Sequence, residues 1–338
     1  MTSVRHTGFT SSASTALAAA ALCGVGAELL SGYGPSTGHV GKVLVDLVFF
    51  TALYGAPAVL VREIARRRGW GWPSMLLGFA ALGVAQCCLI DQSLFSSDYQ
   101  GYDGWRELRD GTWLAWPGVP AYAALSFVVG HVIFSFAAPI AVAEAWRAAD
   151  AHRPWLRWPG IVIAAVAYAA TAGMIAADPQ SHSASTGQLM AGAVLVVGLC
   201  CTATLVGERA TPRVVPRRPV DVPVIVAAAM AAAGIIESVP PTWPGVVIYL
   251  LAIGVGGGLL WRESTTQWWT FRHTAAIGVG VLLARGILAF LGDPLGGDVA
   301  PIAKYLHNIV MLSIVGVAGW FAMRPKATDS AVSSPHCP

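Results

Sequence analysis

The chain has 338 residues, of which 55% are apolar and only 12% are charged, with a formal net charge of +3. A water-soluble domain of this size could not cover its surface with so few polar residues, and the mean hydropathy of +0.61 agrees with this. The composition therefore predicts an all-α integral membrane protein whose main partner is the lipid bilayer. The small net charge indicates no nucleic-acid partner.

The predicted helices follow from the length of the apolar segments, because a helix needs roughly 20 mostly apolar residues to cross a bilayer. About ten such segments occur, at 14–31, 40–61, 73–90, 119–146, 158–177, 188–206, 220–237, 244–261, 273–291 and 299–322. The first could instead be a cleaved signal peptide, although no clear small-residue cleavage site follows it.

The segments imply three regions: a short N-terminus 1–13, a transmembrane helical domain 14–324 and a polar tail 325–338. The tail is rich in Ser and Pro, so we expect it to be disordered. Within the helical domain no soluble domain is predicted.

The basic residues between these segments predict the orientation. If the N-terminus is cytoplasmic, arginine clusters such as 62–68 and 209–218 face the cytoplasm, and only Lys42, Arg106 and Arg109 lie outside. Ten crossings return the chain to the side on which it started. We therefore expect a multi-pass protein of the cell membrane with both termini in the cytoplasm.

The longest outer connection, 91–118, is acidic and aromatic. It carries Phe95, Trp105, Trp113 and Trp116 among five acidic residues, counting Asp91 at its start. This connection could fold over the mouth of the bundle as a lid whose rings line a cavity, or it could lie at the lipid headgroups.

Four acidic residues lie in the outer leaflet half of the predicted helices: Glu28, Asp46, Asp91 and Glu237. An ionisable side chain inside a span costs about 2.5–3.5 kcal/mol on insertion scales, so each such residue is a candidate functional residue. Their convergence on one leaflet is typical of a polar cavity that opens outward. The alternative is that Glu28, Asp46 and Glu237 each touch water at the headgroups.

Polar and basic residues occur at a similar depth in three other segments. His131 and Ser135 share a helix face, and Lys304 and His307 share another. Arg285 is expected beside the latter pair. The cations could pair with Glu237 or Asp91, or they could bind an anionic group of a substrate, and His131 could be either functional or a packing residue.

The cysteines and known motifs indicate no cofactor. The Cys87–Cys88 and Cys200–Cys201 pairs are adjacent and lack the spacing of zinc or redox sites. Phosphate-binding loops, zinc protease motifs and aspartate-rich diphosphate motifs are also absent from the sequence. We expect no metal.

A protonated carboxyl group in an apolar, aromatic pocket offers one chemistry that fits these residues. Burial raises the pKa of a carboxyl group, and such an acid can protonate an alkene, after which aromatic rings stabilise the cation. In this hypothesis Asp91 is the acid, and Glu28, Asp46 or Glu237 assists it. His131 is the base or an orienting residue. The aromatic residues of the 91–118 connection would face the cation.

The first half of the chain carries strings that resemble a known family: ELLSG at 28–32, YGAPAVLVRE at 54–63, GWPS at 71–74, DQSLF at 91–95 and HVIFSFAAPIAVAE at 131–144. They are similar to a broad family of bacterial polytopic membrane proteins. The integral-membrane terpene cyclases of drimentine-type indole–terpenoid pathways resemble the same family. The same region is distantly similar to CPBP-type intramembrane proteases, but Gln86-Cys87-Cys88 stands where those have paired glutamates.

The resemblance implies a membrane-integrated terpene cyclase of secondary metabolism. Its substrate would be a lipophilic prenylated small molecule, such as a farnesylated indole or diketopiperazine, and no metal would be needed. Two other hypotheses remain: a proton-coupled secondary transporter, for which the glycines at 254–258, 278 and 280 could mark broken helices, and a non-catalytic membrane protein.

Overall fold

The protein is an all-α bundle in the computed structural model, which describes residues 4–209 and 215–324. Its α-helices are α1 (Val4–Gly24), α2 (Val40–Phe50), α3 (Ala56–Arg67), α4 (Trp72–Ala85), α5 (Trp105–Asp110), α6 (Ala121–Gly130), α7 (Ala138–Trp146), α8 (Trp158–Ala176), α9 (Thr186–Arg209), α10 (Val222–Ser238), α11 (Trp243–Ser264), α12 (Phe271–Leu288) and α13 (Pro301–Met323). In the described residues the paired strands are β1 (Trp113–Leu114) and β2 (Val119–Pro120), which form an antiparallel hairpin.

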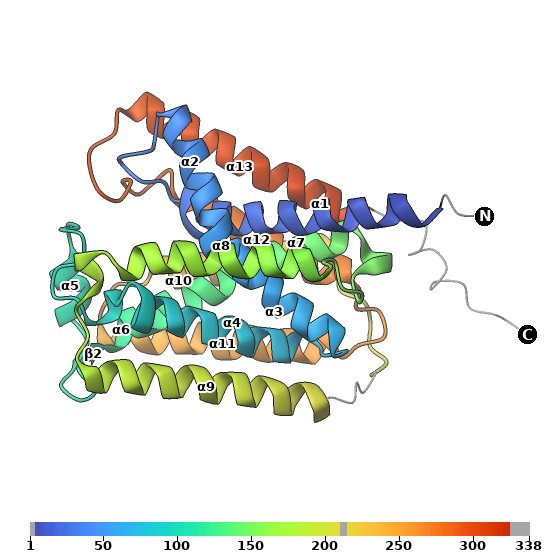
Figure 1. Cartoon of the computed structure of the whole chain (residues 1–338), viewed down its shortest axis with the longest axis horizontal. Coiled ribbons are helices and arrows are strands. Elements are labelled where there is room, and N and C mark those ends of the chain that lie inside the picture. The colour runs from blue at the N-terminus through green and yellow to red at the C-terminus, as the bar shows by residue number, and fades with distance from the viewer. Residues whose placement is uncertain (1–3, 210–214, 325–338) are drawn as a thin grey trace, which may run out of the picture.

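Nine helical stretches of the described chain are long and apolar enough to cross a membrane, as the sequence predicted for most of its segments. The expected span 220–237 is the shorter apolar helix α10, whose 17 residues extend about 26 Å. The start of α1 and the end of α13 lie at the same end of the bundle (Figure 1), which requires an even number of crossings. α10 therefore completes ten crossings, and the protein is a multi-pass membrane protein.

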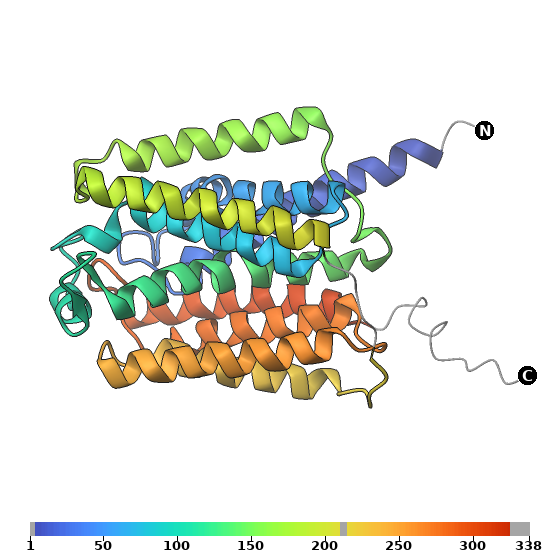
Figure 2. The same cartoon turned by 90° about the horizontal axis from the view of Figure 1, so that it is seen from below.

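The helices differ in how deeply they are buried. α12 packs against α7, α10 and α13 near the centre of the bundle, whereas α8, α9 and α11 expose most of their apolar side chains. Figure 2 shows α8 along one edge and α10 and α11 along the opposite edge. The exposed Val, Leu and Ile residues of these peripheral helices are consistent with contact with lipid.

Two glycines allow the central helices to approach closely. A Cβ at Gly278 would lie 2.6 Å from the Ala138 carbonyl oxygen, and one at Gly280 would lie 2.4 Å from that of Val226. α12 stays a continuous helix at both positions, and α11 is continuous through residues 254–258. The glycines suggested by the transporter hypothesis therefore mark helix packing or exposed helix surface, and they do not mark breaks.

Each of the first four spans contains a π-helical turn, in which the backbone hydrogen bonds join residues five apart. These turns are η1 (Val25–Leu29), η2 (Thr51–Gly55), η3 (Gln86–Ile90) and η5 (His131–Ala137). π-helical turns are rare and are frequently found at functional sites. η5 packs against both η1 and η2, so the three turns define a common region in the outer part of the bundle.

The remaining short 3₁₀ helices are η4 (Ser93–Phe95), η6 (Ala148–Asp150) and η7 (Pro179–Ser181). η4, α5 and β1 belong to the 91–118 connection, and β2 follows it directly; these elements are folded at the outer end of the bundle (Figure 1). Trp105 of α5 packs on Phe127 of α6, with ring centroids 5.8 Å apart. Whether the connection opens as a lid stays a prediction.

Candidate functional site

Glu28 is at the centre of the outer polar residues. It lies in η1, and its carboxylate accepts hydrogen bonds from the hydroxyls of Tyr33 and Tyr54, the latter at 2.5 Å. Tyr54 lies in η2 and is only 5% exposed. Two phenol groups from separate segments thus converge on one carboxylate at the junction of two π-helical turns.

His131 adjoins this group through the ring of Tyr54. The two rings stack with their centroids 5.4 Å apart, and Phe136 lies beside both. A hydrogen bond of 3.2 Å joins Nδ1 of His131 to Oγ of Ser135, as expected from their spacing on a common face. Glu28, Tyr54 and His131 are therefore connected. We call these three residues, together with Tyr33 and Ser135, the Glu28 cluster.

Arg285 connects α12 to the same region. Its guanidinium pairs with the carboxylate of Glu237 at 3.2 Å and donates to the Ala27 carbonyl and the Ser31 hydroxyl, each at 3.3 Å. It also lies 4.6 Å from the centroid of the Phe134 ring. Of the alternatives that the sequence left open for Arg285, the structure contains the ion pair with Glu237, and Arg285 lies within electrostatic range of Glu28.

Asp91 lies at the end of η3 and is 8% exposed. Its carboxylate accepts hydrogen bonds from the Ser93 backbone N–H at 2.8 Å and from the Gln86 amide at 3.1 Å. Burial raises the pKa of Asp91, and these hydrogen bonds partly oppose the shift. The acid proposed from the sequence is thus buried and hydrogen-bonded by polar neutral groups, and it lies within electrostatic range of Glu28.

The other expected residues are distributed around the Glu28 cluster. Lys304 pairs with Asp293 at 3.5 Å, a partner that the sequence had not suggested. Nε2 of His307 lies 2.7 Å from the Leu29 carbonyl oxygen, next to Glu28 in the chain. Asp46 is partly buried on α2, a helix with no fully buried residue.

The aromatic residues of the 91–118 connection lie farther out. The side chains of Trp116 and Trp113 are exposed, at 87% and 38% of their surface, and Trp105 donates from its indole to the Ser96 carbonyl. Phe95 packs against the hydrophobic cluster that contains Leu94. A substrate-binding role for these rings stays a prediction, whereas the rings beside Glu28 come from Tyr33, Phe50 and Tyr54.

Sequence reasoning missed Tyr33 and Tyr54 because it selected ionisable residues inside apolar segments, whereas a tyrosine carries no charge and Tyr33 lies in a connection. Tyr54 opens one of the strings that carry the family resemblance, and Tyr33 follows another by one residue, so their positions were the available signal. It also missed a second polar cluster, at the end of the bundle opposite the Glu28 cluster.

This second cluster consists of Arg62, Glu63, Arg66 and Glu144, and we call it the inner ion-pair cluster. Arg62 and Glu144 are fully buried, and their side chains pair at 3.0 Å, while Arg66 binds Glu144 through two nitrogens at 2.8 and 2.7 Å. Arg62 also pairs with Glu63 at 3.0 Å.

The same cluster holds the connection that follows α7. Arg62 donates to the carbonyl oxygens of Ala151 and Arg153, its guanidinium lies 3.4 Å from the centroid of the Trp155 ring, and Glu63 accepts from the Trp155 backbone N–H at 2.6 Å. With its charges and most of its donors and acceptors paired inside the protein, the cluster has the properties of a structural clamp.

Metal binding finds no support in the described ranges, which contain no group of three or more His, Cys, Asp or Glu side chains that could hold an ion. The expectation that no metal is needed stays a prediction. Cys87 and Cys88 are buried within the bundle and Cys200 and Cys201 are exposed on α9.

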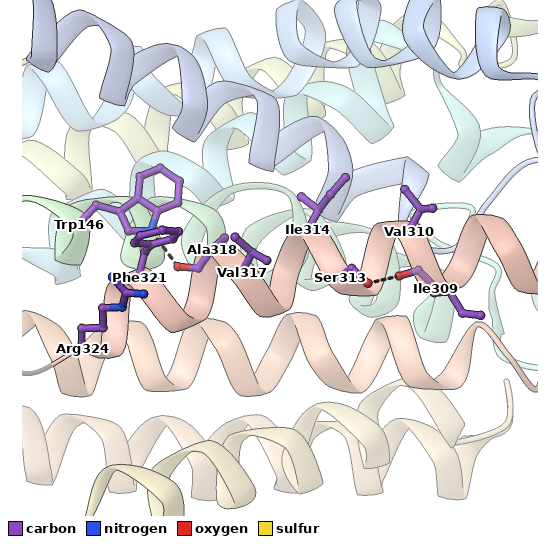
Figure 3. A pocket seen from close by; sticks show the side chains of 9 residues that line it. All are labelled: Trp146, Ile309, Val310, Ser313, Ile314, Val317, Ala318, Phe321 and Arg324. Atoms are coloured by element: carbon purple, nitrogen blue, oxygen red, sulfur yellow. Dashed lines mark hydrogen bonds between the residues drawn. The ribbon is translucent and has the colours of Figure 1, made fainter.

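Two hollows lie outside the Glu28 cluster. A groove of about 930 Å³ follows the exposed face of α13 near Trp146 (Figure 3), and a space of about 10 Å³ lies beneath the 91–118 connection beside Trp105. Neither is lined by Glu28. Tyr33, whose hydroxyl donates to Glu28, stacks on Phe50 with the ring centroids 6.4 Å apart.

Fold and site together define a multi-pass α-helical membrane protein with a carboxylate–tyrosine–histidine cluster in its outer half. Comparison of the chain with known protein families, with curated proteins and with solved structures finds no match. The family resemblance of the first half therefore stays a prediction, and the function must be argued from the cluster.

Proposed function

We propose that the protein is a membrane enzyme that cyclises the prenyl chain of a lipophilic small molecule by protonating one of its double bonds. The observation that carries the proposal is the hydrogen bonding of Glu28 by two tyrosine hydroxyls, one of whose rings stacks on His131. Glu28, rather than Asp91, is then the proton donor, because Glu28 has the tyrosines and the histidine around it.

The two tyrosines suit both protonation states of Glu28. An ionised carboxylate accepts from both hydroxyls, whereas a protonated carboxyl group can donate to one phenol oxygen and accept from the other. Because the partners serve either state, proton loss to a substrate leaves no buried acceptor without a donor. A proton donor that is used repeatedly needs this property.

The surrounding rings suit the cation that protonation creates. Transfer of the Glu28 proton forms a C–H bond and leaves a tertiary carbocation, which the next double bond attacks to close a ring. The rings of Phe50 and Phe136 lie 6.0 and 6.3 Å from the ring of Tyr54, which binds Glu28, and an aromatic face stabilises a cation. Loss of a proton from the cation to the imidazole of His131 ends the reaction, so the product is an isomer of the substrate. His131 then releases this proton to water and Glu28 regains one from water, which restores both groups.

Access to Glu28 requires movement of Tyr33. Tyr33 belongs to the connection between α1 and α2, where Gly34 donates from its backbone N–H to the Leu295 carbonyl at 2.7 Å. Tyr102 of the 91–118 connection lies against Gly296 in the same turn. In the proposal these outer connections cover Glu28 together and separate when a prenyl chain enters from the lipid.

The test uses membranes that contain the protein, incubated with a farnesylated indole in deuterated water. Proton-initiated cyclisation adds one deuteron and releases one proton, so the product carries one deuterium, which mass spectrometry detects and NMR locates. We expect Glu28→Gln to abolish product and Asp91→Asn to retain it, with both proteins present at wild-type amounts in the membrane.

Two outcomes contradict this assignment. Wild-type product from the Glu28→Gln protein would exclude Glu28 as the donor, and loss of product only in the Asp91→Asn protein would return that role to Asp91. No deuterated product from the wild type with farnesylated indoles or diketopiperazines would remove the support for the cyclase.

A proton-coupled transporter is the second candidate, favoured by the Arg285–Glu237 ion pair inside the bundle. Transporters of this kind often contain repeats with broken helices at corresponding positions in two halves. In the described chain, however, the π-helical turns lie between residues 25 and 137, and α8 to α13 are α-helical throughout. The measurement that favours the transporter is uptake into proteoliposomes driven by a pH gradient and lost in Arg285→Met.

A further inference from the structure

The groove along α13 has the chemistry of a lipid site. Its lining residues are Trp146, Ile309, Val310, Ser313, Ile314, Val317, Ala318, Phe321 and Arg324. All are apolar except Ser313, whose hydroxyl donates to the Ile309 carbonyl at 2.7 Å, and Arg324 at the cytoplasmic end. A chain of methylene groups can fill such a surface without leaving a polar atom unpaired.

The groove exists because α13 uses only one of its faces for packing. Met311, Val315 and Gly319 are buried, and a Cβ at Gly319 would lie 2.8 Å from Val279 of α12. Val310 and Val317 on the opposite face remain more than half exposed. Trp146 closes the cytoplasmic end, where its indole donates to the Ala318 carbonyl at 2.9 Å.

The length of the groove along α13 and the positive charge of Arg324 at its end indicate which kind of molecule binds there. From Ile309 to Arg324 the helix extends about 22 Å, which exceeds the roughly 15 Å of hydrocarbon in one leaflet by the depth of a headgroup. The guanidinium of Arg324 contacts the rings of Phe321 and Trp320 at 4.5 and 5.2 Å, and within residues 4–209 and 215–324 it has no acidic partner. A cation at the end of an apolar groove suits a phosphate.

We propose that this groove binds one acyl chain of an anionic phospholipid of the cytoplasmic leaflet, whose phosphate pairs with Arg324. The apolar face of α13 holds the chain, and the indole of Trp146 marks the level of the ester groups, where tryptophan is enriched in membrane proteins. This site is independent of the chemistry proposed at Glu28.

The probe is phosphatidylglycerol, compared with phosphatidylcholine of the same acyl chains. Delipidated protein in detergent is titrated with each lipid, and native mass spectrometry counts the lipids that stay bound. One basic side chain near an anionic headgroup corresponds to about a fivefold preference. We expect the wild type to show this preference and Arg324→Gln to bind both lipids equally.

Two further variants separate the groove from general surface charge. Val317→Trp places a much larger side chain in the groove and should lower binding of both lipids. Arg262→Gln removes an exposed arginine from the same end of the bundle, on α11, and should leave the preference unchanged.

Three results would overturn the proposal. They are equal binding of the two lipids by the wild type, the same loss in Arg262→Gln as in Arg324→Gln, and a change of oligomeric mass in Val317→Trp without a change in lipid binding. The last would show that a second copy of the chain covers this face. Competition by inorganic phosphate that removed the preference without releasing the lipid would support the pairing of Arg324 with the headgroup.

Discussion

The inner ion-pair cluster allows a quantitative test of what holds the bundle together. Glu144→Gln removes the one carboxylate that binds both Arg62 and Arg66, all three side chains being at least 93% buried. Arg62 keeps Glu63 at 3.0 Å, but Arg66 keeps only the Trp70 carbonyl at 3.3 Å. The variant therefore leaves a buried guanidinium without a carboxylate.

Breaking a buried ion pair by removing one partner typically costs about 3–5 kcal/mol, because the remaining charge stays buried. We expect a loss in this range for Glu144→Gln. Replacing both partners with apolar residues, in Arg66→Met/Glu144→Met, should recover much of that loss because it removes the unpaired charge. Arg62 keeps its partner Glu63 in the double variant.

The assay is equilibrium unfolding of purified protein in mixed micelles with an increasing fraction of SDS, followed by tryptophan fluorescence. The control is Asp150→Asn, which breaks the partly exposed pair with Arg147 and should cost no more than about 1 kcal/mol. A cost for Glu144→Gln as small as that of the control would refute the reasoning. The reasoning would also be refuted if the double variant lost as much unfolding free energy as Arg66→Met and Glu144→Met lose together when each is made alone.

Asp91 and two helix glycines test burial and packing elsewhere. Since burial raises the pKa of Asp91 above its usual 3.8, the stability from this group is complete below that pH and is lost as the pH rises through the raised pKa. Asp91→Asn should therefore flatten the dependence of the unfolding midpoint on pH above about pH 4, and an unchanged slope would contradict this. Gly280→Ala, whose Cβ would lie 2.4 Å from the Val226 carbonyl oxygen, should lower the thermal midpoint. Gly256→Ala, with open space around it, should keep or raise that midpoint, and equal effects of the two would show that close packing at Gly280 does not matter.

Hydropathy predicted the spans because crossing a bilayer imposes a minimum length on every apolar helix. The weakest case is α10, whose 17 residues make it the shortest of the ten. Its assignment as a span depends on the start of α1 and the end of α13 lying at the same end of the bundle, which the sequence indicated only through the positions of arginines.

The π-helical turns could not be predicted from the sequence. A π-helical turn changes the hydrogen-bond spacing from four residues to five over a single turn, and this leaves the apolar composition of the segment unchanged. The turn η2 contains Tyr54, whose hydroxyl donates to Glu28, a residue 26 positions earlier in the chain. The pairing depends on how two helices pack, which composition does not contain.

The inner cluster was missed for a different reason. The rule that arginines face the cytoplasm assigned Arg62 and Arg66 to a connection in water. Their burial depends on residues 147–157 folding back over them, about 90 positions later in the chain. A rule based on local sequence cannot detect that cover.

Both polar clusters contain residues of the second and fourth spans, and this links their roles. The second span carries Tyr54 and, eight residues later, Arg62; the fourth carries His131 and, thirteen residues later, Glu144. Along a helix these separations are about 12 and 20 Å. The Arg62–Glu144 pair fixes how far one span can slide along the other, and the stacking of Tyr54 on His131 depends on that register. The inner cluster therefore acts as a clamp that positions the outer one, and weakening it should disturb the Glu28 cluster without touching any of its residues.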